Sequence, residues 1–350
     1  MFAEKIQEDV ARGELISEID LSRLDLTGAK LCGGIFEKCD LRKAKLARAT
    51  FQESALFGCN LAGADLSGAN LRHVVMTDPN LEGALLPGAC LIAARLTGPK
   101  LARADLAGAD LALAAMTCPD LCGASLARCN LDRAALVDAR VEGADFSGAI
   151  LRRTVLVKCD LTSVKLAGAV CKNAIFIGSK LAGLDLRGMS LEQTQFIDAD
   201  LTGCDLSGAL LSGCNFKGAN LQGAKLAGAT LVQALFAGAR LVEASLTDAR
   251  LRHTVWAEAE LGGADFSGAD LYESVLAKTR CEGARFVGAE LSYCDFSHAD
   301  ITRCDFSRAT LFRTRFHRTK EADTIFTDRS AALGDDELLA EAEQWLEGKE

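Results

Sequence analysis

The sequence predicts an all-β solenoid, a parallel four-sided β-helix of about 15 coils with a short α-helical cap at each end. Two repeating patterns carry this prediction. A large apolar residue, mostly Leu or Phe, stands at every fifth position from Leu21 to Phe316, and the residue two places before it is nearly always small. A longer period of twenty residues is marked by Pro79, Pro99 and Pro119, which stand in the related segments MTDPN, LTGPK and MTCPD.

A period of five fits neither regular element. On an α-helix, five residues turn through about 500°, so the large residues would spiral around the helix. On a flat strand, an odd period would place successive large residues on opposite faces. We therefore expect the chain to turn once per pentapeptide, with the large residue and the small residue both pointing inward. The positions on either side of the large residue point outward, and the last position, often Gly, forms the corner.

The twenty-residue period predicts four sides per coil. In the column from Asp25 to Asp305, the position just before the large residue is mostly charged. In the neighbouring column the same position is mostly apolar, at Ile35, Ala55, Val75, Ala115, Ala135, Val155, Ile175, Leu235, Val255 and Val275. Because each column keeps its character over steps of twenty, we expect residues twenty apart to stack on one another.

The motif Ala64-Asp65-Leu66-Ser67-Gly68, followed by Ala69-Asn70-Leu71, resembles the pentapeptide-repeat proteins, and the resemblance covers about residues 19–320. It implies a right-handed quadrilateral β-helix from a bacterial protein. The extent of the repeats predicts three parts: an N-terminal helical cap over 1–20, the solenoid over 21–320, and a C-terminal segment with an amphipathic helix over 321–350.

Both ends of a solenoid expose apolar core and need covering. Phe2, Ile6 and Val10 recur at helical spacing and predict a capping helix over 2–12. A second helix is expected to begin at Asp335 or Asp336. Its apolar side is formed by Leu338, Leu339, Ala342, Trp345 and Leu346. This helix is either a cap on the last coil or the contact of a homodimer, because some members of the family dimerise through their C-terminal ends.

No catalytic chemistry is visible, and we expect neither an enzyme nor a cofactor nor a metal site. Of the fourteen cysteines, most fall in slots that otherwise hold Ala or Leu, so they are read as small buried hydrophobes. The four histidines show no metal-ligand spacing with them. Neither a nucleophile–base pair nor a phosphate loop is present, and a narrow, filled solenoid offers no pocket for a small substrate.

Charge and hydropathy bear on location and partners. The N-terminus carries Glu4, Lys5, Glu8 and Asp9 where a signal peptide needs an apolar stretch, and no apolar run is long enough to span a membrane. A cytoplasmic protein without membrane contact is therefore expected. The acidic residues concentrate at the two ends, which leaves the repeats nearly neutral. Direct nucleic-acid binding is not expected.

One outward face is apolar and is the candidate partner-binding strip. Its residues are Ala135, Val137, Val155, Val157, Ile175, Ile177, Ile197, Leu235, Val255 and Val275. Contiguous apolar surface tends to mark a contact site. The alternative is that Val and Ile simply favour the most strand-like side of the coil.

A second candidate is a ring of arginines near the end of the repeats, at Arg303, Arg308, Arg313, Arg315 and Arg318. Such a ring suits either an anion site or the docking of the acidic tail helix that follows. The docking of the tail is favoured, because the acidic tail has to lie close to this ring.

The sequence therefore favours a non-catalytic scaffold that binds a protein partner through its solenoid faces. Two alternatives come from the resemblance. The first is a DNA mimic that occupies a type II topoisomerase such as gyrase, which needs acidic columns spaced like phosphates. Lys45, Lys165, Lys225 and Arg285 interrupt the most acidic column. The second is an accessory or adaptor role in bacterial secretion, which rests on the resemblance alone.

Overall fold

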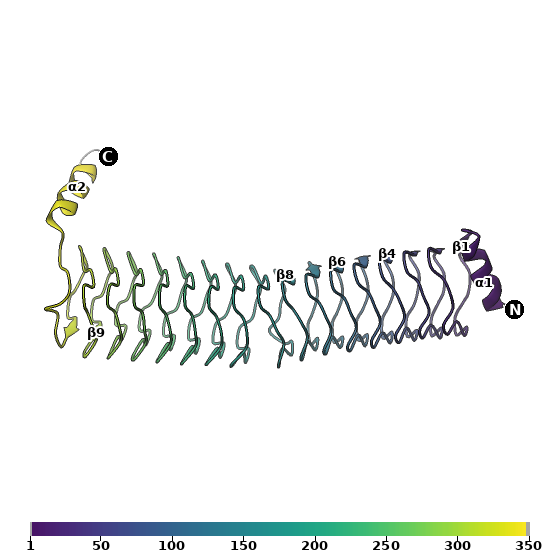
Figure 1. Ribbon diagram of the computed structural model, residues 1–350, viewed down its shortest axis with the longest axis horizontal. Helices are drawn as coiled ribbons and strands as arrows, with labels where there is room; N and C mark the ends of the chain where they lie inside the picture. The colour runs from purple at the N-terminus through teal and green to yellow at the C-terminus, as the bar shows by residue number, and fades with distance from the viewer. Residues whose placement is uncertain (1, 348–350) are drawn as a thin grey trace. The chain divides into compact units, whose positions relative to one another are not determined.

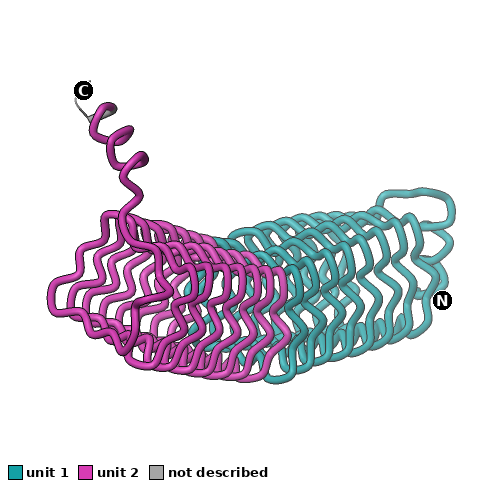
Figure 2. The backbone as a smooth tube through the Cα atoms, turned by 60° about the vertical axis from the view of Figure 1, so that its left-hand side comes forward, with its two compact units in different colours: residues 1–180 teal, residues 181–350 magenta. Residues whose placement is uncertain are grey.

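The computed structural model describes residues 2–347. The chain forms two compact units, residues 1–180 and 181–350 (Figure 2). Unit 1 begins with helix α1 (Phe2–Ala11) and holds eight strands: β1 (Leu15–Ser17), β2 (Ile35–Glu37), β3 (Ala55–Phe57), β4 (Val75–Thr77), β5 (Arg95–Thr97), β6 (Ala115–Thr117), β7 (Ala135–Val137) and β8 (Val155–Val157). Unit 2 holds β9 (Asp305–Phe306), β10 (Ile325–Phe326) and helix α2 (Glu337–Glu347), all labelled or coloured along the chain in Figure 1.

Each unit is a stretch of parallel β-solenoid with twenty residues per coil, as predicted. In unit 1 the strands pair in parallel with a register of twenty, so that Ile35 faces Ala55 and Ala55 faces Val75. The other three sides are joined by single β-bridges with the same register, such as Asp40 with Asn60. Unit 2 repeats this pattern, for example from Asp205 to Lys225. The predicted four-sided coil is confirmed.

Nearly every corner of the coil is made by a residue in the left-handed region. Gly63 has φ +64°, and the amide of Ala64 donates to the Leu61 carbonyl over 3.0 Å to close the turn. The same conformation recurs at residues other than glycine, as at Arg48 with φ 58°. Because a left-handed residue with a Cβ costs roughly 1–2 kcal/mol, the bonds between coils must hold these corners in place. The Arg48 amide, for example, donates to the Ser67 carbonyl of the next coil over 2.9 Å.

The core is filled by stacked side chains. In unit 2 the rings of Phe196, Phe216, Phe236 and Trp256 stack one above another with centroids 5.1, 4.9 and 4.0 Å apart. Trp256 is fully buried, and its indole Nε1–H donates to the Thr254 hydroxyl over 2.7 Å. Aromatic pairs in this arrangement stabilise beyond the area they bury. The predicted inward stacks are therefore confirmed.

The cysteines behave as the repeat pattern predicts. Cys129 and Cys204 are fully buried in the small slot, and their thiols lie 2.8 and 2.9 Å from the carbonyls of Leu106 and Leu181. The Thr154 hydroxyl donates in the same way to the Leu131 carbonyl. Burial raises the pKa of the Cys129 thiol to about 12, so this thiol stays protonated and inert.

The two ends are closed differently. At the N-terminus, α1 buries Ile6 and Val10, and the predicted cap is confirmed. At the other end, the sequence predicts that the tail helix is either a cap or a dimer contact, and its apolar side is largely exposed. Leu338 and Trp345 of α2 remain 80% and 63% exposed, and Ala342 is exposed too, whereas the side chain of Leu346 lies outside the described residues.

Residues 321–334 close the last coil instead of α2. Ile325 pairs with Asp305 and Leu333 with Arg315, which continues the ladder by part of a coil. The guanidinium of Arg329 lies 4.9 Å from the ring centre of Phe316 and 5.1 Å from that of Phe326. Arg329 also pairs with Glu321, so a neutralised cation covers the last aromatic rings. The apolar side of α2 is not needed for closure, which explains its exposure.

The outward aspartates predict a loss of stability in acid. Each commonly accepts the backbone amide two residues later, as Asp145 does from Ser147 over 2.8 Å. Hydrogen bonds from the Ser147 side chain and backbone lower the pKa of Asp145, and hydrogen bonds from Arg187 lower that of Asp185 to about 2. A carboxyl whose pKa is lower in the folded than in the unfolded chain stabilises the fold above the unfolded value of about 3.9.

We therefore expect the melting temperature to fall progressively as the pH is lowered from about 5 to about 2. Asp145→Asn keeps the oxygen that accepts the Ser147 amide and should remove the share of this pH dependence that Asp145 contributes. Melting followed by circular dichroism across this range provides the test. A melting temperature that stays constant down to pH 2 would contradict the role given to these carboxylates.

Candidate functional site

The predicted apolar strip of unit 1 lies on the one side of the coil where β1–β8 form a continuous sheet. In each strand the middle residue is buried and its two neighbours point outward, so β7 presents Ala135 and Val137. Val155 and Val157 of β8 follow, and Ile175 is bridged to Val155 in the next coil. Val137 is 41% exposed, and the others are half-buried. Since stacked strands lie about 4.8 Å apart, these side chains form one apolar surface.

The same sheet carries more apolar surface than the strip in our sequence analysis included. Leu15, Ile35, Phe57 and Val75 are exposed by 54, 43, 40 and 39% on its outer face. Ile35 and Val75 stand in the predicted apolar column, and Phe57 stands in the column of Val137. On this face, Arg95 and Thr97 of β5 interrupt the apolar columns. A shallow hollow of about 420 Å³ lies around Arg95, lined also by His73, Val75, Ala93, Leu113 and Ala115. We call the outer side of β1–β8, together with Ile175 and Ile177, the apolar sheet face.

In unit 2 the predicted strip is shorter. Leu235, Val255 and Val275 are bridged in sequence, and Leu235 and Val275 are 42 and 38% exposed. Asn215 precedes them in the same column and Asp295 follows, so the apolar run ends on both sides. Ile197 stands in a neighbouring column where Lys217 comes next. The predicted continuation through unit 2 is therefore a separate cluster of three residues.

The position of the strip bears on its two interpretations. In unit 1 the apolar columns coincide with the strands, which is what strand propensity alone would produce. In unit 2 the cluster from Leu235 to Val275 is joined by single bridges and lies outside the strands of the described chain. Strand preference therefore accounts less well for the second cluster than for the first.

Three aspartates of the most acidic column pair with a base one coil away. Lys45 lies 3.7 Å from Asp25, Lys165 lies 3.8 Å from Asp145, and Arg285 lies 3.9 Å from Asp265. Such exposed pairs contribute only about 0–1 kcal/mol each to stability, but they set the sign of the surface. The column that would have to imitate a row of phosphates carries four bases among its eight aspartates.

The predicted arginine ring is divided among different partners. Arg303 pairs with Glu282, and Arg315 lies 3.9 Å from Asp295. Arg318 contacts α2: its Nη1 lies 3.2 Å from Glu343, and its Nη2 donates to the Ala340 carbonyl. The backbone amides of Arg308 and Arg313 donate to Thr327 and Ala331 in the closing segment. The ring thus contributes one described side chain, that of Arg318, to the docking of the tail helix, and its role as an anion site stays a prediction.

An exposed aromatic row in unit 2 escaped the sequence analysis. The rings of Tyr272, Tyr293 and Phe312 meet edge to face with centroids 5.6 and 5.5 Å apart, and the Arg252 guanidinium lies over Tyr272. Tyr293 and Phe312 are 43 and 49% exposed. The signal was their recurrence at steps of about twenty, one or two places after the large residue. Exposed Tyr and Arg side chains are frequent in protein interfaces.

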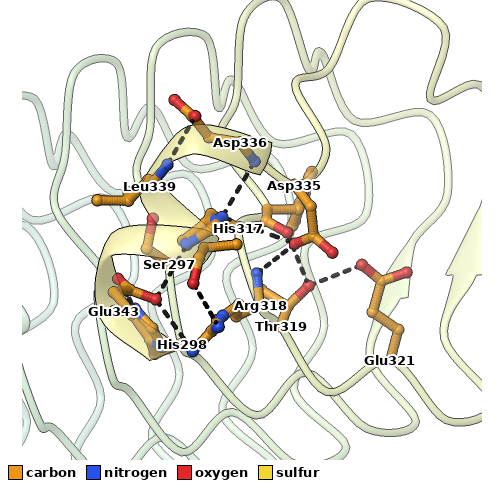
Figure 3. Close-up of polar contacts among 12 residues, drawn as sticks. Ser297, His298, His317, Arg318, Thr319, Glu321, Asp335, Asp336, Leu339 and Glu343 are labelled. Atoms are coloured by element: carbon orange, nitrogen blue, oxygen red, sulfur yellow. Dashed lines mark hydrogen bonds and ion pairs between the residues drawn. The ribbon is translucent and has the colours of Figure 1, made fainter. Parts of the chain in front are cut away.

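One group of described side chains has the composition of a metal site. The ligand atoms of His298, His317 and Glu343 lie within 4.8 Å of one another where α2 meets the last coils (Figure 3). His317 is fully buried, and Glu343 is 23% exposed. The search for metal-ligand spacing missed this group because its residues come from two coils and the tail helix.

A separate finding concerns membranes: no helix in the described residues is long and apolar enough to cross one.

Comparisons with known proteins place the chain in a family. The sequence model for pentapeptide repeats matches residues 19–117 and 120–320 in overlapping segments. No curated protein sequence matches the chain.

Some solved structures are similar to the chain at low identity. QnrB1, a plasmid-mediated fluoroquinolone resistance protein, is 22% identical, with 54% of this chain and 89% of that one covered and a TM-score of 0.31. HetL, involved in heterocyst differentiation regulation in Nostoc sp. strain PCC 7120, is 27% identical over 82% and 95%, with a TM-score of 0.21. A pentapeptide repeat protein of the Arabidopsis thaliana thylakoid lumen is 30% identical over 38% and 69%, with a TM-score of 0.14. Because the family's sequence model covers most of the repeats, the chain belongs to the pentapeptide-repeat family.

Proposed function

We propose that the chain is a non-catalytic scaffold that binds a protein partner through the apolar sheet face. The observation that carries this proposal is the run of exposed apolar side chains on the outer side of β1–β8, including Ile35, Phe57, Val75 and Val137. Arg95 of β5 interrupts the run, and from Ala135 to Ile177 both outward columns are apolar without a break. Soluble monomers rarely expose contiguous apolar surface of this kind. The partner is therefore expected to present an apolar surface of its own.

The rim of the face adds a charge preference. Arg133, Arg153 and Lys158 form corners beside β7 and β8, with Asp138 among them, and the side chains of Arg133 and Arg153 are 55 and 50% exposed. Asp132 lies 3.9 Å from Arg133 and 3.6 Å from Arg153, so it neutralises part of this positive charge. A partner with acidic residues around an apolar patch would complement the rim. Complementary rims contribute mainly to the association rate and to specificity.

Energetics set what the face can do. Fully covering six Val or Ile side chains would contribute on the order of 10 kcal/mol. Their stacked neighbours already cover more than half of the surface of each, so about half of that remains. Association costs of ~4–15 kcal/mol consume much of it, so the polar rim is needed for a stable complex.

The test is a pair of matched double variants. Val157→Asp with Ile177→Asp places two charges on the apolar sheet face, whereas Ala127→Asp with Ala167→Asp places them on the opposite side of the coil. We expect the first variant to lose partner binding by at least tenfold in Kd, about 1.4 kcal/mol, and the second to bind like the wild type. Circular dichroism must show both variants folded. Undiminished binding by the folded first variant would mean that the face reflects strand propensity.

Two other outcomes identify different occupants or functions. If light scattering shows a dimer that becomes monomeric in the first variant, the partner is a second copy of this chain. Inhibition of gyrase supercoiling that is lost on neutralising Asp65, Asp105 and Asp145 would favour the DNA-mimic function instead. We expect no such inhibition, because Lys45 and Lys165 interrupt that column.

We also propose that the protein works in a bacterial cytoplasm. All fourteen cysteines are free, and most are buried. A reducing compartment suits such a chain, because its exposed thiols, Cys32 and Cys118, would be oxidised elsewhere.

A further inference from the structure

Helix α2 is held to the last coils of unit 2 by polar side chains that converge on Glu343 (Figure 3). Its Oε1 lies 3.1 Å from His298 Nε2, and its Oε2 lies 3.3 Å from His317 Nε2. Arg318 Nη1 approaches the same carboxylate at 3.2 Å. Since Leu338 and Trp345 are largely exposed, this cluster is the main described attachment of the helix.

His317 uses both of its ring nitrogens in this arrangement. Its Nδ1 accepts the backbone amide of Asp336 over 3.1 Å, so the neutral ring carries its proton on Nε2 and donates it to Glu343. The Asp335 carboxylate lies 3.7 Å from Nδ1. The ring is fully buried, which makes it a rigid element of the site.

The spacing of the ligand atoms suits a tetrahedral metal ion. Zinc binds imidazole nitrogen and carboxylate oxygen at about 2.0–2.2 Å, which places neighbouring ligand atoms about 3.3 Å apart. The two N···O distances here are 3.1 and 3.3 Å, to different oxygens of Glu343, and the three ligand atoms lie within 4.8 Å of one another, so a small closing movement would bring them around one ion. Two imidazoles and one carboxylate make a three-ligand set that leaves a fourth position for water.

We propose that His298, His317 and Glu343 bind one Zn²⁺ ion, which clips α2 onto the last coils. The ion takes the place of the proton between His317 and Glu343. The ring proton then sits on Nδ1 and faces the Asp335 carboxylate, the arrangement of many metal-bound histidines. Because a protonated Nδ1 no longer accepts a hydrogen bond, the backbone amide of Asp336, just before α2, then donates to water instead. Arg318 releases Glu343 and keeps the Ala340 carbonyl.

The chain offers a matched control for this site. His253 Nδ1 lies 3.3 Å from Glu273, which reproduces a single His–Glu contact in the same unit. The described residues place no third ligand beside this pair. Because His317 is fully buried and its replacement could unfold the coil, the test variants are Glu343→Gln and His298→Ala, whose side chains are 23 and 35% exposed.

The experiment is calorimetric titration of the full chain with ZnCl₂ after alkylation of the exposed cysteines, followed by proteolysis with and without zinc. We expect one ion per chain for the wild type and for His253→Ala. Glu343→Gln and His298→Ala should bind at least ~100-fold more weakly, since even outer partners of a metal site cost ~10–100-fold in affinity. Zinc should slow cleavage within residues 327–336 only where the site is intact. The proposal is overturned if the wild type binds no zinc, if the two site variants bind like the wild type, or if zinc leaves the cleavage rate unchanged.

Discussion

Replacing Phe236 by Ala is expected to destabilise unit 2 by about 3–5 kcal/mol, because it opens a large cavity in the middle of a filled core. The ring is fully buried and lies between Phe216 at 4.9 Å and Trp256 at 4.0 Å. Both neighbours belong to the adjacent coils, which cannot collapse sideways without breaking the ladder. Denaturant unfolding measures the loss.

The control for this change is Leu235→Ala, one residue earlier and 42% exposed. It removes an outward side chain of similar chemistry and should cost less than about 1 kcal/mol. In a solenoid each coil contacts only its neighbours, so hydrogen exchange should speed up most around residues 216–256 in Phe236→Ala. Equal losses for the two variants would contradict the inward and outward assignment of the repeat positions.

Ile6→Asp is expected to detach helix α1 from the first coil. Ile6 is 1% exposed, and a carboxylate cannot be buried there without a partner. We expect α1 to detach and leave the charge in water. The loss of stability is then limited to the free energy of docking α1, about 3–5 kcal/mol for two buried aliphatic side chains. Limited proteolysis within residues 2–12 measures this detachment.

Phe2→Asp serves as the control because Phe2 is 45% exposed in the same helix. It should leave the cleavage rate of α1 close to that of the wild type. The variant Gly34→Ala gives an independent check of α1 docking, because the added Cβ would lie 2.7 Å from the Phe36 ring and 3.1 Å from Val10 of α1. Resistance of Ile6→Asp to proteolysis would show that α1 is not held by its apolar side.

The solenoid was predictable from the sequence because one rule repeats along the chain. Leu66 and Ala64 both turn inward, and the longer period places residues twenty apart in one column, as the pairing of Asp65 with Lys45 shows. Helix α1 was predictable for a related reason, since its apolar side has a single surface to pack against, the exposed core of the first coil. In both cases local pattern and tertiary packing demand the same arrangement.

The C-terminal end was less predictable because an amphipathic pattern does not indicate which surface the helix packs against. The apolar side of α2 predicted either a cap or a dimer contact, whereas the described contacts run through Glu343 and Arg318. The covering of the last coil by Arg329 depends on two rings in different repeats, Phe316 and Phe326. The dimer interpretation of α2 stays a prediction.

The candidate surfaces were found in part. Val137 and Val157 were predicted to stack, and the register of β7 and β8 places them opposite one another. Phe57 was missed because its column is otherwise filled with Thr in the following coils. His298 and His317 were not linked because their approach depends on where Glu343 of the tail helix lies.

Site-specific photo-cross-linking in cells tests the proposed scaffold most directly. A photoreactive side chain is placed at Val137 on the apolar sheet face and, in a second construction, at Ala167 on the opposite side of the coil. The proposal predicts a discrete protein adduct from Val137 that disappears with the Val157→Asp, Ile177→Asp change, and none from Ala167. An adduct from Ala167 without one from Val137 would contradict it, because the partner would then contact a different face.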